Sequence, residues 1–381
     1  MKYPIGKEQP ARQFKGAVKF VNIQKNAFFS TLRKRVDEYF NANNLSRYGN
    51  QKLLIKTCVL LLMYLLPLFV LVFTTPVFGV SLVLWALMGI GMAGLGMSVM
   101  HDANHGSYSS NKTVNWSMAH VLNLMGGSTV NWKLQHNILH HTYTNITHMD
   151  DDIASKPALR LSPHTTVNRL HRYQWVHSFL LYGLTTLYWV TAKDFVQFFR
   201  YRKNGLNTTP ASQNWWTVTK IVLVKLFYFS LFILMPVLVF NIPLIQVIIG
   251  FLVMHFLAGL ILTVIFQLAH SLEGTSHPLP DKKGIIENDW AIHQMNTTMN
   301  FAGNNKWLSW YVGGLNFQVE HHLFPKVSHV HYPVLSRIVR ATANEFHIPY
   351  LEHRTFGMAL GAHIVFLKKL GRLPDIDEAI G

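Results

Sequence analysis

Two long tracts without a charged residue limit what this chain can fold into. No Asp, Glu, Lys or Arg occurs in the 45 residues 57–101, or in the 47 residues 226–272. A helix needs about 20 apolar residues to cross a bilayer, so each tract is long enough for two spans. The motifs "TTPVFG" and "NIP" indicate a turn near the middle of each tract. The sequence therefore predicts two helical hairpins. Their four spans are expected at residues 54–74, 79–100, 221–240 and 245–268.

The charged residues outside these tracts predict how the chain lies in the membrane. The first 53 residues contain 11 Lys and Arg against 3 acidic residues, and the two turns within the hairpins contain no Lys or Arg. By the positive-inside rule, both termini and the long central loop are expected in the cytoplasm. The predicted fold class is an all-α, multi-pass integral membrane protein with a helical cytoplasmic cap. Its expected parts are a basic N-terminal arm at 1–53, a membrane domain at 54–345 and a cytoplasmic C-terminal tail at 346–381.

Other sequence features narrow the interpretation further. The apolar stretch 175–192 is short and partly polar, so it is interpreted as an interfacial or re-entrant helix and not as a fifth span. The net charge of +16 suits a cytoplasmic face that meets anionic lipid headgroups. Nucleic-acid binding is not expected, because the basic residues are dispersed and no binding motif accompanies them. The single cysteine, Cys58, excludes a disulfide framework and a cysteine-based metal site.

Histidines gather where the expected spans end on the cytoplasmic side. The motifs "HDANH", "HNILHH" and "QVEHH" and the end of the fourth span contain eight of them, and a glutamine precedes the last pair. Neutral imidazole is the commonest metal ligand, and histidine clusters without cysteine suit iron, copper or zinc. Eight histidines exceed the about four to six ligands that one ion accepts, so two ions are expected. The residues concerned are His101, His105, His136, His140, His141, His270, His321 and His322, with Gln318.

These three motifs, in this order and on one side of the membrane, resemble the histidine boxes of membrane fatty acid desaturases. The "QVEHH" form is similar to the front-end branch, which includes linoleoyl-CoA and delta-6-like desaturases. The resemblance implies an O2-dependent acyl desaturase that introduces a double bond into a fatty acyl chain carried on CoA or on a lipid. It also implies a centre of two iron ions that receives two electrons. The eight histidines would be its ligands, and Gln318 would lie at or near the irons.

The chain departs from part of that branch at its N-terminus. Many members carry a fused cytochrome b5 domain with an H-P-G-G motif, whereas residues 1–53 contain no histidine and are too short for such a domain. No haem is therefore expected on this chain. The electrons would come from a separate donor such as ferredoxin or cytochrome b5.

Further residues receive expected roles around the metal site. Metal-bound imidazoles usually donate their outer N–H to a carboxylate or carbonyl. Candidates for this outer layer are Asp102, Asp150, Asp151, Asp152, Glu320 and His293. Candidates for the wall of an acyl tunnel are Trp132, Trp310 and Phe317. His255 is expected to be hydrogen-bonded inside the membrane, too far from His270 to join the site. Seven more histidines are expected near the surface, namely His120, His148, His164, His171, His177, His329 and His331.

Two other functions fit parts of the pattern. A lipid or alkane hydroxylase of the same di-iron superfamily would use the same ligands, and product analysis separates the two reactions. A histidine-rich metal transporter would need polar ligands inside the spans along a conduction path. The span interiors offer only His255 and scattered Ser, Thr, Asn and Gln, so desaturation is the favoured interpretation.

Overall fold

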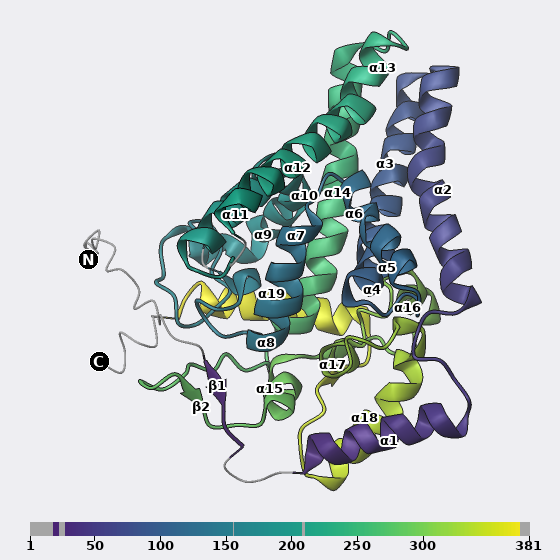
Figure 1. Cartoon of the computed structure of the whole chain (residues 1–381). Coiled ribbons are helices and arrows are strands. Elements are labelled where there is room, and N and C mark those ends of the chain that lie inside the picture. The colour runs from purple at the N-terminus through teal and green to yellow at the C-terminus, as the bar shows by residue number, and fades with distance from the viewer. Residues whose placement is uncertain (1–17, 23–26, 155, 208–209, 374–381) are drawn as a thin grey trace.

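Four long apolar helices form the frame of the molecule. The computed structural model describes residues 18–22, 27–154, 156–207 and 210–373. Within these residues four helices are long and apolar enough to cross a membrane, which confirms the predicted number and the all-α membrane fold class. The four candidate spans are Gln51–Thr74, Phe78–His105, Gln213–Leu238 and Leu244–His270. They run side by side toward the top of Figure 1, and the remaining elements lie around their lower ends.

Two of the spans are composed of several helical segments. The first span is α2 (Gln51–Thr74) and the fourth is α14 (Leu244–His270). The second span joins α3 (Phe78–Gly94), the π-helix η1 (Leu95–Val99) and α4 (Met100–His105). The third joins α12 (Ala211–Phe229), the π-helix η6 (Ser230–Leu234) and α13 (Met235–Leu238). The second helix therefore continues past residue 100, where the predicted span ends, and His101 and His105 lie on it.

The hairpin turns lie where the sequence predicts them. Thr75 ends α2 in a left-handed conformation with φ 40°, and Asn241 adopts φ 53° between α13 and α14. Within the bundle, α3 approaches its neighbours closely at two glycines. A Cβ on Gly89 would lie 2.5 Å from the Met254 carbonyl oxygen, and one on Gly91 would lie 2.7 Å from the Tyr64 nitrogen. Small residues at helix contacts are typical of membrane bundles, which rely on close packing.

The central loop folds into short helices below and beside the spans. It begins with α5 (Lys112–Ala119), α6 (Val121–Leu124), α7 (Thr129–Trp132), the π-helix η2 (Lys133–His140) and α8 (His141–Tyr143). The 3-10 turns η3 (Asp151–Ile153) and η4 (Leu170–Tyr173) follow. The loop ends with α9 (Gln174–Gly183), α10 (Thr185–Tyr188), the π-helix η5 (Trp189–Lys193) and α11 (Asp194–Lys203). The stretch 175–192 is therefore divided among three short segments, and its interfacial placement stays a prediction.

The C-terminal part completes the cap together with residues before the first span. Its helices are α15 (Trp290–Thr297), α16 (Lys306–Tyr311), α17 (Gln318–Leu323), the 3-10 turn η7 (His329–His331), α18 (Tyr332–Glu345) and α19 (Phe356–Leu370). Two short parallel strand pairs join β1 (Lys19–Phe20) to β2 (Ile285–Ile286), and β3 (Asn300–Phe301) to β4 (Glu352–His353).

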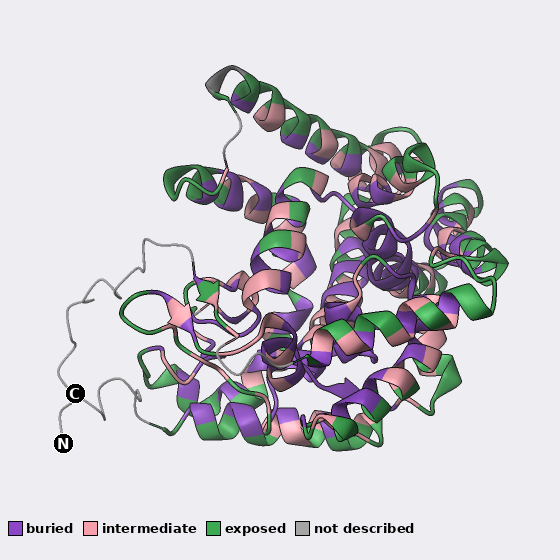
Figure 2. Cartoon of the chain, turned by 60° about the horizontal axis from the view of Figure 1, so that its bottom comes forward, coloured by how far each residue is buried: buried purple, intermediate pink, exposed green. Residues whose placement is uncertain are grey.

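The segments predicted as an arm and a tail both contain a packed helix. In the arm, α1 (Phe28–Ala42) buries Leu32 and Val36 in one core with Leu335 and Val339 of α18. In the tail, α19 packs against α9 and α14. Figure 2 shows that buried residues gather at the centre of the molecule and that the outer sides of the helices are exposed. The cap is therefore a folded unit against which the histidine motifs can be positioned.

Candidate metal centre

The structure brings together every histidine that the sequence analysis assigned to a metal site. They lie on α4, on η2 and the first residue of α8, on the last residue of α14, and on α17. These segments lie close together at the lower end of the bundle in Figure 1. All eight side chains are buried except that of His105, which is partly exposed. Residues 101 to 322 thus contribute to one cluster at one end of the spans.

Two of these segments adjoin or form a π-helix. The turn η1 directly precedes α4, and η2 itself contains His136 and His140. Single π-helical turns occur frequently at functional sites. The His136 and His140 rings stack with centroids 5.3 Å apart. The His140 ring lies 4.7 Å from that of His270, so the π-helix presents its histidines to the end of α14.

A double-glycine turn brings α17 against the second span. Gly313 and Gly314 adopt φ 62° and 67°, in a backbone region that residues other than glycine rarely occupy. A Cβ on Gly313 would lie 2.5 Å from the Met97 carbonyl oxygen of η1. The turn therefore permits a backbone contact that leads into α17, where the His321 ring lies 4.5 Å from that of His101.

The ring nitrogens fall into sets of the size that metal ions require. Among the described residues, three sets offer ligand atoms within 4.8 Å of one another. They are His101 with His105, His136 and His321; His140 with His270 and His322; and His136 with His140 and Asp152. His141 lies between the first two sets, with its ring 4.6 Å from His321 and 4.4 Å from His322. Two adjacent ions fit this arrangement better than one.

Many of these nitrogens lack a hydrogen-bond partner among the described residues. They are Nε2 of His105, His140, His270, His321 and His322, and both ring nitrogens of His141. The Nε2 atoms of His101 and His136 face each other at 3.0 Å. A buried polar atom without a partner costs about 1–3 kcal/mol, and a metal ion that accepts the lone pairs would remove this cost. The residues present therefore fit bound metal ions.

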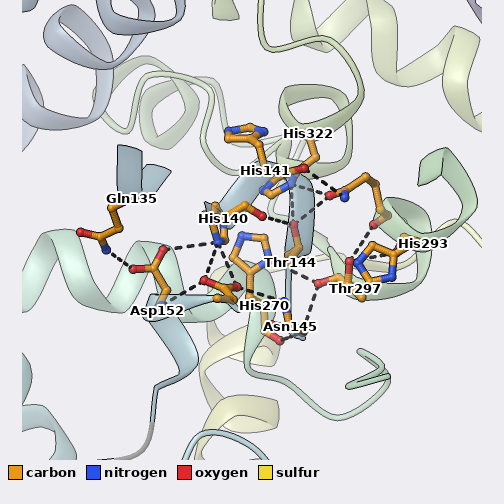
Figure 3. A network of polar contacts seen from close by, with 12 residues as sticks. Gln135, His140, His141, Thr144, Asn145, Asp152, His270, His293, Thr297 and His322 are labelled. Carbon is orange, nitrogen blue, oxygen red and sulfur yellow. Dashed lines mark hydrogen bonds and ion pairs between the residues drawn. The ribbon is translucent and has the colours of Figure 1, made fainter. Parts of the chain in front are cut away.

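The opposite nitrogens of several rings are held by hydrogen bonds. Nδ1 of His140 lies 3.1 Å from an Asp150 oxygen and 3.3 Å from an Asp152 oxygen. Figure 3 shows the contact of His140 with Asp152, and His270 and His322 close to it. Nδ1 of His270 lies 3.3 Å from the Thr297 carbonyl. Nδ1 of His321 lies 3.1 Å from the Tyr332 hydroxyl, and Nδ1 of His322 lies 2.8 Å from Gln294 Oε1. Carboxylate, carbonyl and amide oxygens only accept, so these bonds place the proton on Nδ1 of His140, His270 and His322 and leave the Nε2 lone pair for a metal.

The pKa values of four of the cluster histidines agree with this role. Burial lowers the pKa of His136, His141, His321 and His322 well below the usual value, and neighbouring imidazoles lower it further. These rings are therefore neutral near pH 7. Burial also lowers the pKa of His140, but Asp150 and Asp152 outweigh it, and the net pKa is raised. Among these five histidines, His140 is therefore the one whose pKa is set by neighbouring carboxylates.

The chain's sequence has clear relatives. The family model described as "Fatty acid desaturase" matches residues 76–354. The chain belongs to the fatty acid desaturase family. It is 34% identical to the "sn-1 linoleoyl-lipid 6-desaturase" of Arthrospira platensis, over 91% of this chain and 94% of that protein. The "sn-1 linoleoyl-lipid 6-desaturase" of Synechocystis sp. is also 34% identical, over 92% of this chain and 97% of that protein. The "Acyl-lipid (8-3)-desaturase" of Physcomitrium patens is 32% identical, over 97% of this chain and 78% of that protein.

These relatives confirm the resemblance drawn from the three motifs. The protein is a fatty acid desaturase, an oxidoreductase of lipid metabolism that acts on fatty acids. Its histidine cluster is able to bind metal.

Two of the candidate acidic residues of this desaturase form their hydrogen bonds with residues outside the histidine cluster. The Asp102 carboxylate accepts hydrogen bonds from Ser328 Oγ at 2.7 Å, His329 Nδ1 at 2.9 Å and the His329 N–H at 3.3 Å. Asp151 accepts hydrogen bonds from Arg200 and Tyr201.

The contacts of Glu320 also point away from the histidines. Its carboxylate accepts hydrogen bonds from Asn300 Nδ2 at 2.7 Å and the Tyr350 hydroxyl at 2.9 Å. Burial raises the pKa of Glu320 to about 7. Among the candidate carboxylates, Asp150 and Asp152 are the ones with a described contact to a cluster histidine.

The expected tunnel residues differ in their positions. Trp132 lies against the cluster, with its ring 4.4 Å from that of His136. Trp310 lies 5.6 Å from the Lys56 ammonium nitrogen. Phe317 packs in the core that α1 and α18 share.

Gln318 is buried one turn before His321, and its Nε2 has no partner among the described residues.

The expected positions of four other histidines can also be compared with the structure. His255 bonds to the Tyr228 hydroxyl at 2.9 Å and to Thr186 Oγ1 at 3.1 Å, which confirms the expected intramembrane hydrogen bonding. The surface placement of His171, His329 and His331 is wrong, because all three are buried.

His329 is buried because its ring bridges two groups from different spans. It lies between Asp102 and Lys56, whose ammonium nitrogen is 2.7 Å from His329 Nε2.

Four residues that contact the site or its outer partners were not identified from the sequence, namely Lys56, Gln294, Tyr332 and His329. For Gln294 a signal existed, since "HQMNTT" at 293–298 is a polar run between apolar neighbours. His293 belongs to this run and is buried, and its Nε2 has no partner among the described residues.

Proposed function

We propose that this desaturase introduces a double bond into an acyl chain that is carried on a lipid, at a centre of two iron ions. The proposed ligands are the eight histidines of the cluster, with Gln318 at or near the irons. The observation that carries the proposal is the convergence of unpartnered imidazole nitrogens from four segments far apart in the sequence. When bound, the irons would supply the O2-dependent removal of two hydrogens, which no amino-acid side chain can perform.

The protein's own residues would position the ligands and the substrate. Asp150, Asp152, Gln294 and Tyr332 hold the outer nitrogens of three rings, which keeps the inner lone pairs directed at the ions. Burial of the cluster would keep bulk water away from the reacting carbons. Trp132, against His136, is the tunnel candidate best placed to contact an acyl chain at the centre.

A lipid carrier is supported by the names of the relatives. Three of them, at 32–34% identity, are named as acting on linoleoyl-lipid or acyl-lipid. The position of the cluster at the ends of the spans also suits a substrate that stays in the bilayer. The names differ in the position of the double bond, so product analysis must determine it.

Two further parts of the proposal are the orientation, which rests on the distribution of charges, and the electron donor. We infer that the cluster, both termini and the cap face the cytoplasm, because Lys and Arg are absent from both hairpin turns and frequent elsewhere. A separate protein such as ferredoxin or cytochrome b5 would deliver two electrons. Together with two protons and O2, they balance the formation of the double bond and two molecules of water.

Expression in a host that lacks the activity tests this function. Lipid classes would be separated, and their fatty acids profiled with double-bond localisation. We expect new unsaturated chains from the wild type and none from His321→Ala. The control His120→Ala should retain activity, since the described contacts of the His120 side chain are a hydrogen bond to the Trp116 carbonyl and a ring contact with Trp116, away from the cluster. Activity in His321→Ala would contradict the ligand assignment, and a product that gains one oxygen would indicate the hydroxylase alternative.

A further inference from the structure

Helix α11 presents a buried polar face beside the metal centre. Asp194, Gln197 and Tyr201 are buried, and their spacing of three and four residues places them on one side of the helix. On the other side, Val196 and Phe199 are exposed. Buried polar side chains are normally hydrogen-bonded, so the partners of this face show what it supports.

The partners form a continuous chain that reaches a proposed metal ligand. Gln197 Nε2 donates to Gln135 Oε1 at 2.6 Å. Gln135 Nε2 donates to one oxygen of Asp152 at 2.6 Å. The other Asp152 oxygen lies 3.3 Å from Nδ1 of His140. Figure 3 shows the inner part of this chain, from Gln135 through Asp152 to His140.

The chemistry of the two ends fixes the direction of every hydrogen bond in the chain. The Asp152 carboxylate only accepts, so Gln135 must turn its NH2 group toward it and its oxygen toward Gln197. Gln197 must then turn its own NH2 group toward Gln135. At the outer end, the Tyr201 hydroxyl donates to Asp151, and its oxygen accepts from Gln197 at 3.1 Å. Neither amide can rotate by half a turn without placing like groups against each other.

The far end of the chain is held rigidly. Asp194 pairs with Lys225 of the third span at 2.6 Å and accepts from the Ser128 N–H at 3.1 Å. Its carbonyl also accepts from Asn131 Nδ2 at 2.6 Å. These contacts tie α11 both to the third span and to the helix that leads into η2. Gln197 therefore projects from a fixed support.

We propose that Gln197 and Gln135 are positioning residues that orient Asp152, and through it the His140 ring, for metal binding. The inference rests on the proposed metal centre. Gln135 occupies one oxygen of Asp152 and leaves the other for the His140 N–H. That contact, together with the hydrogen bond that Nδ1 donates to Asp150, directs the Nε2 of His140 toward His270 and His322. Neither glutamine contacts the metal or the substrate, and each acts through its neighbour.

Metal release from the purified full-length protein tests the proposal. Bound metal would be counted by elemental analysis, and its release to excess chelator followed with time. We expect Gln197→Met to release metal about tenfold faster than the wild type, within the 10–100-fold range typical of outer partners of metal ligands. Gln213→Met is the matched control, because Gln213 is exposed on α12, and it should release metal at the wild-type rate.

A double-mutant cycle separates a chain from two independent effects. Because Gln197 acts through Gln135, Gln197→Met should add nothing once Gln135→Met is present. If the two substitutions together speed metal release by the product of their separate factors, the two residues act independently and the proposal is overturned. So would a Gln197→Met protein that keeps the wild-type release rate and loses only the stability of its metal-free form. If Gln197→Met does not fold, Tyr201→Phe keeps the ring and removes the hydroxyl that accepts from Gln197, and it must speed release for the proposal to stand.

The same experiment distinguishes this proposal from the proposed function. A wild-type protein that contains no metal after purification and reconstitution with iron would contradict the metal centre itself. A wild type that holds metal, beside variants that release it at the same rate, would contradict only the role of Gln197 and Gln135.

Discussion

The buried ion pair between Asp194 and Lys225 allows the attachment of α11 to the third span to be measured. Asp194 Oδ2 lies 2.6 Å from Lys225 Nζ, and the two side chains are 1% and 7% exposed. Lys225 Nζ also donates to the carbonyls of Gly126 at 2.6 Å and Trp189 at 2.8 Å. The substitution Asp194→Ala would leave the ammonium group buried with these two carbonyls alone.

The expected loss follows from the contacts that disappear. Removal of one partner from a buried ion pair costs about 3–5 kcal/mol. Asp194 also accepts the Ser128 N–H, and such a bond contributes about 1 kcal/mol. We therefore expect Asp194→Ala to lower the free energy of unfolding by about 4–6 kcal/mol. The double variant Asp194→Leu with Lys225→Met should be more stable than Asp194→Ala by about 2 kcal/mol or more. An apolar pair of similar volume often replaces a buried ion pair at little cost.

Equilibrium unfolding in mixed micelles with increasing SDS would measure both values. The exposed pair of Lys34 and Glu38 serves as the control, since Lys34→Ala should change the free energy of unfolding by about 0–1 kcal/mol. The reasoning would be refuted if Asp194→Ala stayed within about 1 kcal/mol of the wild type. It would also be refuted if the double variant were as unstable as the single one.

Two further predictions concern the metal centre and the cap. Asp150→Ala should weaken metal retention about 10–100-fold, because it removes the closest partner of the His140 Nδ1 atom, whereas the exposed Asp37→Ala should leave the metal content unchanged in elemental analysis. Leu335→Ala, in the fully buried contact of α18 with α1, should lower the free energy of unfolding by about 2–5 kcal/mol. A cost below about 1 kcal/mol would show that α1 is not part of the folded cap.

The sequence was sufficient to predict the frame and the histidine cluster, for physical reasons. Charged residues are rare in the hydrocarbon core, so the two charge-free tracts located most of the four spans. The third span extends beyond its tract, back to Gln213. Spacings of three and four residues place His101 with His105, and Gln318 with His321, on shared helix faces. Neither inference requires knowledge of the loops.

The outer layer of the site could not be predicted in the same way. Contacts such as Gln197 to Gln135, or His329 to Asp102, join residues 62 and 227 positions apart, and they depend on the paths of loops. Glu320 illustrates a more local reason. It lies on the same short helix as His321, but successive helical residues turn by about 100°, and its carboxylate therefore faces Asn300 instead of the cluster.

The π-helical turns have a consequence for how this architecture can change. A hydrogen bond to the fifth residue encloses one residue more than a bond to the fourth, so η1 acts as an angular spacer within the second span. Deletion of one residue from Leu95–Val99 would convert the π-turn to a regular α-turn and leave His101 and His105 on nearly the same face, whereas a deletion within the regular helix α3 would turn both residues by about 100° around the axis. The imidazoles would then point away from the cluster, although the composition and apolar length of the span would hardly differ. Single-residue deletions should consequently be tolerated better in Leu95–Val99 than in α3.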